Sequence, residues 1–185
     1  MTTRPRPHDP RRLDVERLAR EGAQLDGAWP LAGMQRVVDS CHPDAAPPAP
    51  QDVTWSARGE LRRVGAEAQT WLELEVHTRV RLTCQRCLGP VDIALDVRRR
   101  FRFVDGEEAA AALDAEIDDD VLARTRALDL HELAEDELLL AMPIVPRHDV
   151  CPEPIRIAAP QPGADDATTS AGPFAALAAL RRVRH

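Results

Sequence analysis

Four residues of the sequence carry side chains that bind transition metals through sulfur or nitrogen. Cys84 and Cys87 form a C-x-x-C pair, and His148 and Cys151 form an H-x-x-C pair farther along the chain. A gap of two residues lets both members of a pair face one ion, and zinc takes four nitrogen or sulfur ligands in a tetrahedron. One interpretation is therefore a Zn2+ site that ties the two pairs together.

Two other interpretations of the cysteines stay open, because nothing in the sequence brings the two pairs into contact. Either the thiols are buried or idle, or the C-x-x-C pair performs redox chemistry. A reactive C-x-x-C usually lies at the N-terminus of a helix, where the helix dipole lowers the thiol pKa. Here residues 88–90 continue a turn into a strand, which argues against a thiol oxidoreductase.

A second group of candidate site residues consists of arginines that follow the first cysteine: Arg86, Arg98, Arg99, Arg100 and Arg102. Guanidinium groups match phosphate oxygens, so these side chains are predicted contacts to RNA. The alternative is that they pair across a sheet with Glu73, Glu75 and Asp96, which would neutralise much of their charge. No aromatic residue interleaves with these arginines, so we do not expect a platform that stacks RNA bases.

A third group is acidic and lies on a predicted helix: Glu132, Glu135, Asp136 and Glu137. These carboxylates are either the solvated face of that helix or a surface for a basic partner, such as a ribosomal protein or an assembly factor. Near the C-terminus, Phe174 and Leu177 share one face of a short apolar segment. We predict that this segment also contacts a protein.

The sequence carries no motif of a known catalytic centre. A phosphate-binding loop, a nucleophile elbow, an H-E-x-x-H pair and a dinucleotide fingerprint are all missing from it. We therefore expect no enzymatic activity and no small-molecule substrate. The polar, proline-rich N-terminus and the lack of a long apolar run predict a cytoplasmic protein without membrane contact.

The C-x-x-C pair lies between two stretches of alternating apolar and polar residues, 71–84 and 90–103. This alternation is typical of half-buried strands, and the two stretches read as an antiparallel hairpin. A register with Cys84 opposite Val91 would place Glu73 opposite Arg102, although a slip by two residues would keep the same faces. Arg99 breaks the pattern, because it falls on the apolar face.

Other elements are predicted from caps, periodicity and turn residues. Helices are expected at 11–21, 31–39, 107–113 and 130–142, and strands at 25–29, 53–57 and 60–64. Asp9 and Asp129 are expected to cap helices, and Gly22 to end one. Arg58 and Gly59 are expected to form a turn, and so are residues 118–120 within the acidic stretch 115–122.

These elements predict an α+β protein with a central antiparallel, partly barrel-like β-sheet, flanking helices and a disordered C-terminal linker. With 185 residues, of which 44% are hydrophobic, the chain is long enough to bury a core. Four segments are expected: N-terminal helices and a connector at 1–50, a β-rich core at 51–151, the linker at 152–172 and a docking helix at 173–185.

Three stretches of this sequence resemble the bacterial YceD family of large ribosomal RNA subunit accumulation proteins. They are the C-Q-R-C-L run that begins at Cys84, the run from Asp129 to His148, and P-F-A-A-L-A-A-L from Pro173. The residues from Leu13 to Gly27 and from Met34 to Val38 are also similar to the family, so the resemblance covers most of the chain.

The resemblance implies a non-catalytic role in the synthesis, processing or stability of 23S rRNA during assembly of the large ribosomal subunit. The implied partners are 23S rRNA or pre-large-subunit particles. Relatives often carry further cysteines after the last helix, which suggests metal binding, whereas this sequence has only His148 and Cys151 there. The alternative function is a metal-stabilised protein-protein adaptor that does not contact RNA.

Overall fold

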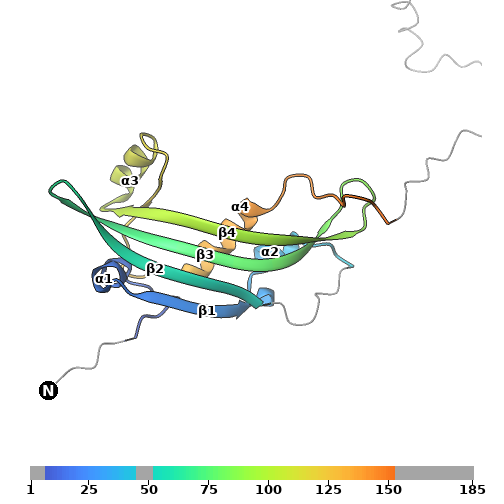
Figure 1. Ribbon diagram of the computed structural model, residues 1–185, viewed down its shortest axis with the longest axis horizontal. Coiled ribbons are helices and arrows are strands. Elements are labelled where there is room, and N and C mark those ends of the chain that lie inside the picture. Colours follow the sequence, from blue (N-terminus) through green and yellow to red (C-terminus); the bar gives the residue numbers. More distant parts are fainter. Residues whose placement is uncertain (1–6, 45–51, 153–185) are drawn as a thin grey trace, which may run out of the picture. The chain divides into compact units, whose positions relative to one another are not determined.

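The computed structural model describes residues 7–44 and 52–152, and Figure 1 labels its elements. In chain order they are α1 (Val15–Glu21), β1 (Gln24–Pro30), the short 3-10 helix η1 (Leu31–Gly33), α2 (Gln35–Asp39), β2 (Asp52–Val64), β3 (Glu67–Thr83), β4 (Pro90–Val104), α3 (Glu107–Asp114), β5 (Asp120–Ala123) and α4 (Leu130–Ala141). Apart from Pro152, the predicted linker and the predicted C-terminal helix lie outside the described residues.

The five strands form one open sheet in the order β1-β2-β3-β4-β5. Strands β1 to β4 pair antiparallel with their neighbours, whereas β5 pairs in parallel with residues 101–104 of β4. A parallel pair needs a crossover connection, and α3 lies in that connection. The predicted α+β class is confirmed, but the sheet is mixed and does not close into a barrel. None of the described helices is long and apolar enough to cross a membrane.

One face of the sheet shares a single hydrophobic core with α1, α2 and α4. The helices contribute Val15 and Leu18 from α1, Val37 from α2, and Leu130, Ala134 and Leu138 from α4. The last three recur every four residues and therefore lie on one side of the helix. Residues of the predicted segments 1–50 and 51–151 therefore belong to the same core. The opposite face of the sheet carries the charged side chains.

Strand β2 is a single continuous strand, so the predicted turn at Arg58 and Gly59 is wrong. Gly59 is buried and pairs with Leu72 of β3 in the regular register. A Cβ atom at position 59 would lie 2.6 Å from the backbone nitrogen of Ala19 in α1. The glycine is therefore needed for the close approach of α1 to the sheet, rather than for a turn.

The hairpin of β3 and β4 has the predicted faces but a different register. Val91 lies opposite Leu82 instead of Cys84, so Glu73 faces Arg100. Strand pairing stops at Thr83 because the following six residues form the hairpin tip, where the Cys84 N–H donates to the Gly89 carbonyl over 2.9 Å. The slip of two residues keeps every side chain on its predicted face.

Helix α1 begins later than the sequence predicts. Asp14 is its N-cap and accepts a hydrogen bond from the Arg17 N–H, whereas Asp9 caps only a turn before the helix. Gly22 ends the helix as predicted, with a φ of 58°. Pro10, which suggested the earlier start, lies in a turn. After this turn, Leu13 forms an isolated antiparallel β-bridge with Leu128.

The remaining helices follow their predictions in part. Asp129 caps α4 as expected and accepts hydrogen bonds from the N–H groups of His131 and Glu132. The predicted helix at 31–39 is divided into η1 and α2, and Val38 of α2 is 37% exposed. The acidic stretch is not only a turn, because residues 120–123 form β5.

Candidate metal centre and the charged face of the sheet

The tip of the hairpin positions the C-x-x-C pair. The Leu88 N–H donates to the Cys84 carbonyl over 2.9 Å, and Leu88 itself adopts a positive φ of 61°. This tight turn brings Cys87 back beside Cys84, which is fully buried. Both sulfurs therefore lie at the same end of the sheet.

The segment after α4 brings the second pair to the same place. After Pro143 the chain runs along the hairpin, and the Gln85 N–H donates to the Pro146 carbonyl over 2.8 Å. Beyond that contact, Nε2 of His148 lies 3.0 Å from the carbonyl oxygen of Pro90. The two pairs, which the sequence could not connect, therefore meet at the hairpin tip.

The four predicted ligands form one cluster of the kind that could hold a metal ion. Their ligand atoms all lie within 4.8 Å of one another. The sulfurs of Cys84 and Cys151 are 3.9 Å apart, and the Cys87 sulfur is 3.4 Å from Nδ1 of His148. Tetrahedral zinc with bonds of about 2.3 Å to sulfur and about 2.0 Å to nitrogen would set these separations near 3.8 and 3.5 Å. The donor set and its spacing therefore fit zinc.

The hydrogen bonds of His148 favour the tautomer that a metal needs. Its Nε2 faces the Pro90 carbonyl, which can only accept, so Nε2 carries the proton. The lone pair is then on Nδ1, the atom that faces Cys87. Histidine ligands of metals are commonly oriented in this way by a carbonyl on the other ring nitrogen.

The two cysteines of the C-x-x-C pair differ in acidity. Burial opposes ionisation of Cys84, but hydrogen bonds from the backbone N–H groups of Cys87 and His148 lower its pKa to about 5. For Cys87 the Gly89 N–H favours the thiolate, but burial and the neighbouring sulfurs raise the pKa. Without a cation, the C-x-x-C pair therefore favours a thiolate at Cys84 beside a thiol at Cys87, and a divalent cation would offset the charge of a second thiolate.

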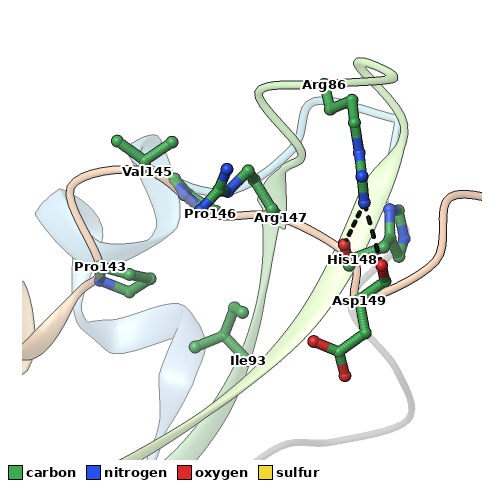
Figure 2. Close-up of a pocket in the computed structure, with 8 residues that line it drawn as sticks. All are labelled: Arg86, Ile93, Pro143, Val145, Pro146, Arg147, His148 and Asp149. Atoms are coloured by element: carbon green, nitrogen blue, oxygen red, sulfur yellow. Dashed lines mark hydrogen bonds between the residues drawn. The ribbon is translucent and has the colours of Figure 1, made fainter. Parts of the chain in front are cut away.

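Arg86 braces this cluster instead of pointing away from it. Its Nε donates to the Cys151 sulfur over 3.1 Å, and its terminal nitrogen donates to the carbonyls of His148 and Asp149 (Figure 2). Three of the five N–H donors of this guanidinium are therefore engaged within the protein, which leaves one terminal nitrogen for a phosphate group. The sequence, which predicted Arg86 as a contact to RNA, contained no signal for these partners.

Three of the other predicted RNA contacts have acidic partners on the protein. Arg98 pairs with Glu73 at 2.7 Å, and Arg99 pairs with Glu137 at 3.1 Å. The side chain of Arg102 is only 17% exposed, and its nearest carboxylate is 4.0 Å away. Among the five predicted arginines, only Arg100 is exposed without a carboxylate partner among the described residues.

An aromatic side chain does lie among the arginines, contrary to the expectation from sequence. Trp71 is on the charged face of the sheet, with the guanidinium groups of Arg62 and Arg100 over its ring at 5.2 and 5.1 Å. The ring is 6% exposed. It therefore holds the arginines in place by cation–π contacts and is covered from solvent, so it offers no free face to a base.

Arg58 is a further basic residue that the sequence argument missed. In the sheet Glu73 has Arg58 on one side and Arg100 on the other, so two exposed cations flank one carboxylate that Arg98 also binds. Arg58, Glu73 and Arg100 thus form one row across β2, β3 and β4. The sequence argument missed this row because it assigned position 58 to a turn. Treated as one strand, the alternation of β2 places Arg58 on the charged face.

The acidic residues of α4 have two different environments. Glu135 and Glu137 are 8% and 7% exposed and pair with Arg36 and Arg99, so the solvated-face interpretation is wrong for them. Glu132 is exposed, and Asp136 is partly exposed and contacts Arg36. These two remain for the predicted contact to a basic protein.

Two further predictions of protein contacts concern Phe174 and Leu177, which lie outside the described residues. The structure therefore leaves them as predictions.

The fold and the site together define an α+β protein with a candidate Cys3His metal centre at the tip of a long hairpin. The chain belongs to the YceD family, because the family model described as "Large ribosomal RNA subunit accumulation protein YceD" matches residues 72–181, more than half of its length. That description implies a role in the accumulation of large-subunit rRNA. No curated protein and no solved structure matches the chain.

Proposed function

We propose that this protein is a non-catalytic cytoplasmic factor that supports the synthesis, processing or stability of 23S rRNA during large-subunit assembly. The observation that carries this proposal is the family match, which covers most of β3, all of β4 and α4, and all four cluster residues. Its partners would be 23S rRNA or pre-large-subunit particles.

The second part of the proposal is that Zn2+ binds Cys84, Cys87, His148 and Cys151. The separations of their ligand atoms and the tautomer of His148 support zinc. Bound there, the ion would join the hairpin tip to the segment that follows α4. Its role would be structural, because four protein ligands leave no open coordination position.

The third part concerns the surface that meets RNA. Arg58 and Arg100 are exposed, are fixed in a rigid sheet, and have no carboxylate partner of their own among the described residues. The Arg100 guanidinium, which is held over the ring of Trp71, would contact phosphate with little loss of side-chain entropy, and Arg58 would add a second cation across Glu73. Arg98 and Arg102 lie on the same face and would add charge, whereas Arg86 and Arg99 have partners elsewhere in the protein.

The test is the ratio of 23S to 16S rRNA in cells that lack the protein and in cells complemented with variants. We expect deletion to lower 23S selectively and Arg58→Glu with Arg100→Glu to fail in restoring it. Arg126→Glu is the matched control, because Arg126 is exposed, has no ion-pair partner among the described residues and lies in the connection between β5 and α4 instead of on a strand. A balanced ratio after deletion would contradict the proposed function.

A second candidate function is a metal-stabilised adaptor that binds only proteins. It is favoured by one observation, that Arg86, Arg98 and Arg99 are engaged within the protein. Ultraviolet crosslinking in cells separates the two candidates. The adaptor predicts no crosslinked rRNA, and the RNA-binding factor predicts crosslinks that the Arg58→Glu and Arg100→Glu changes remove.

A further inference from the structure

A pocket of about 390 Å3 lies beside the hairpin tip, between β4 and the segment that follows α4. Figure 2 shows Ile93 on the strand side and Pro143, Val145 and Pro146 on the other side, with Arg147 at the same wall. Its lining thus combines aliphatic side chains with cationic ones. The lining has no Phe, Tyr or Trp, and its one aromatic ring is the imidazole of His148, whose nitrogens face the Pro90 carbonyl and the Cys87 sulfur.

Exposed aliphatic side chains are concentrated in the segments that form this pocket or adjoin them in sequence. Among the described residues, eight large hydrophobic side chains are exposed, and five of them belong to the hairpin tip, the end of α4 or the segment after it: Leu88, Leu140, Ile144, Val145 and Val150. Ile144 is 98% exposed and Val150 is 86% exposed. Such a concentration of apolar surface is typical of a site that another protein covers.

The pocket adjoins an open edge of the sheet. β4 pairs with β3 along its whole length, but β5 covers only residues 101–104 on the other side. For residues 91–100 no backbone hydrogen bond to any described segment other than β3 is present. An unpaired strand edge is a template for an extended peptide, which would bind it by main-chain hydrogen bonds.

The charge around the pocket selects among partners. Arg147 is exposed and pairs with no carboxylate of the described residues, and the Arg86 side chain forms another part of the wall. Asp149 is the single acidic residue of the lining. A partner with a carboxylate opposite Arg147 would therefore be attracted, and a strongly basic one would not.

We propose that this pocket and the open edge of β4 bind an extended segment of a partner protein. An aliphatic side chain of that segment enters the pocket against Ile93 and Val145, and a neighbouring carboxylate pairs with Arg147. A protein segment fits better than RNA, because the lining has no Phe, Tyr or Trp, the His148 ring is held by Pro90 and Cys87, and the open edge of β4 offers main-chain hydrogen bonds to a peptide. The inference goes beyond the contact to rRNA proposed above and does not depend on it.

The candidate metal centre would keep the pocket in shape. The wall from Pro146 to Asp149 is attached to the hairpin tip by the bond from Gln85 and by the two carbonyl bonds of Arg86. His148 belongs both to the lining and to the cluster. Loss of the cluster is therefore expected to loosen this wall and to lower the affinity of the pocket for the partner segment.

The experiment selects displayed random 12-residue peptides on the full-length protein and measures the affinity of a synthesised winner by fluorescence anisotropy. We expect winners that combine aliphatic and acidic residues. Val145→Asp and Arg147→Glu should each lower the affinity about tenfold or more. The matched control is Val64→Asp, because Val64 is exposed to a similar extent, 58% against 52%, at the opposite end of the hairpin strands.

Two further measurements make the outcome decisive. Proline at alternate positions of the winning peptide should abolish binding, because proline cannot donate to a strand edge. The inference is overturned if no selected peptide depends on Val145 and Arg147, or if these changes instead weaken a 12-nucleotide oligouridylate. If the Arg58→Glu and Arg100→Glu changes left the 23S rRNA level unaffected, the proposed RNA contact would be refuted, but peptide binding would remain. The two proposals can therefore fail separately.

Discussion

The guanidinium of Arg86 lies 3.1 Å from the sulfur of Cys151 while the same side chain holds the carbonyls of His148 and Asp149. One residue of the hairpin tip thus positions both members of the second ligand pair. Arg86 would therefore act on the metal through the ligands, without touching the ion.

The first prediction is that Arg86→Gln weakens zinc binding about 10- to 100-fold, the usual cost of losing an outer partner of a metal ligand. Competition with a chromophoric chelator measures the affinity directly. Arg147→Gln is the control, since Arg147 lies nearby and makes no bond to the cluster among the described residues. Equal affinities of both variants would contradict the role given to Arg86.

The second prediction is that the purified protein binds one zinc ion and that its removal lowers thermal stability. A chelator should lower the Tm by about 5 °C, which for a domain of this size corresponds to about 2 kcal/mol. Cys84→Ser with Cys87→Ser should remove both the zinc and the effect of the chelator. Metal analysis and a thermal melt with and without chelator provide the measurement.

Cys41 provides the control for the metal prediction. It is also a free cysteine, but its sulfur donates to the Val37 carbonyl over 3.3 Å and it is not part of the cluster. Cys41→Ser should retain the full zinc content. If the chelator lowered the Tm of the double variant as much as the Tm of the unmodified protein, the proposed metal site would be refuted.

The sequence predicted the parts of the fold that depend on local signals. The strict alternation around the C-x-x-C pair gave both faces of the hairpin, because a strand has a period of two residues. Asp129 and Gly22 marked the ends of helices through capping interactions within a few residues. The four candidate metal ligands were selected by their type and spacing alone, and the structure brings them together.

The parts that the sequence did not reveal depend on contacts between distant segments. The role of Gly59 needs the position of α1, and the partners of Arg86 and Glu137 lie on other elements. Trp71 lies far from the arginine run in sequence, and only strand pairing brings it beside Arg100. Pattern reasoning cannot assign such partners before the register is known.

The third prediction is that two buried carboxylates of α4 respond to pH with opposite signs. Burial opposes ionisation of Glu135, but the side-chain and backbone donors of Arg36 outweigh it and lower the pKa below the ordinary 4.5. Its stabilisation is present above pH 4.5 and is lost as the pH falls through the lower folded pKa. Glu135→Gln should therefore cost about 2 kcal/mol at pH 7 and less near pH 4.

Glu137 has the opposite shift, because burial raises its pKa more than Arg99 lowers it. Its contribution to stability is present below pH 4.5 and is lost as the pH rises through the folded pKa. Glu137→Gln should therefore be less destabilising at pH 7 than near pH 4. Urea denaturation of both variants at pH 4 and pH 7 measures how the loss of stability changes with pH. A change of the same sign in both variants would contradict the different environments assigned to Glu135 and Glu137.

The last prediction concerns Gly59, where α1 meets the sheet. A Cβ atom at this position would lie 2.6 Å from the Ala19 nitrogen and 2.6 Å from the Leu18 carbonyl carbon. Backbone atoms cannot move aside as a flexible side chain can, so Gly59→Ala should push α1 from β2 and cost about 3 kcal/mol.

The matched control for this change is Gly33→Ala. A Cβ atom at Gly33 would lie 3.7 Å from Nε2 of His131, which is ordinary contact. This variant should be nearly neutral, or stabilising by about 0.5 kcal/mol through a less flexible unfolded chain. Urea denaturation of both variants measures the difference. A loss for Gly59→Ala no larger than that for Gly33→Ala would mean that α1 does not pack directly on the backbone of β2.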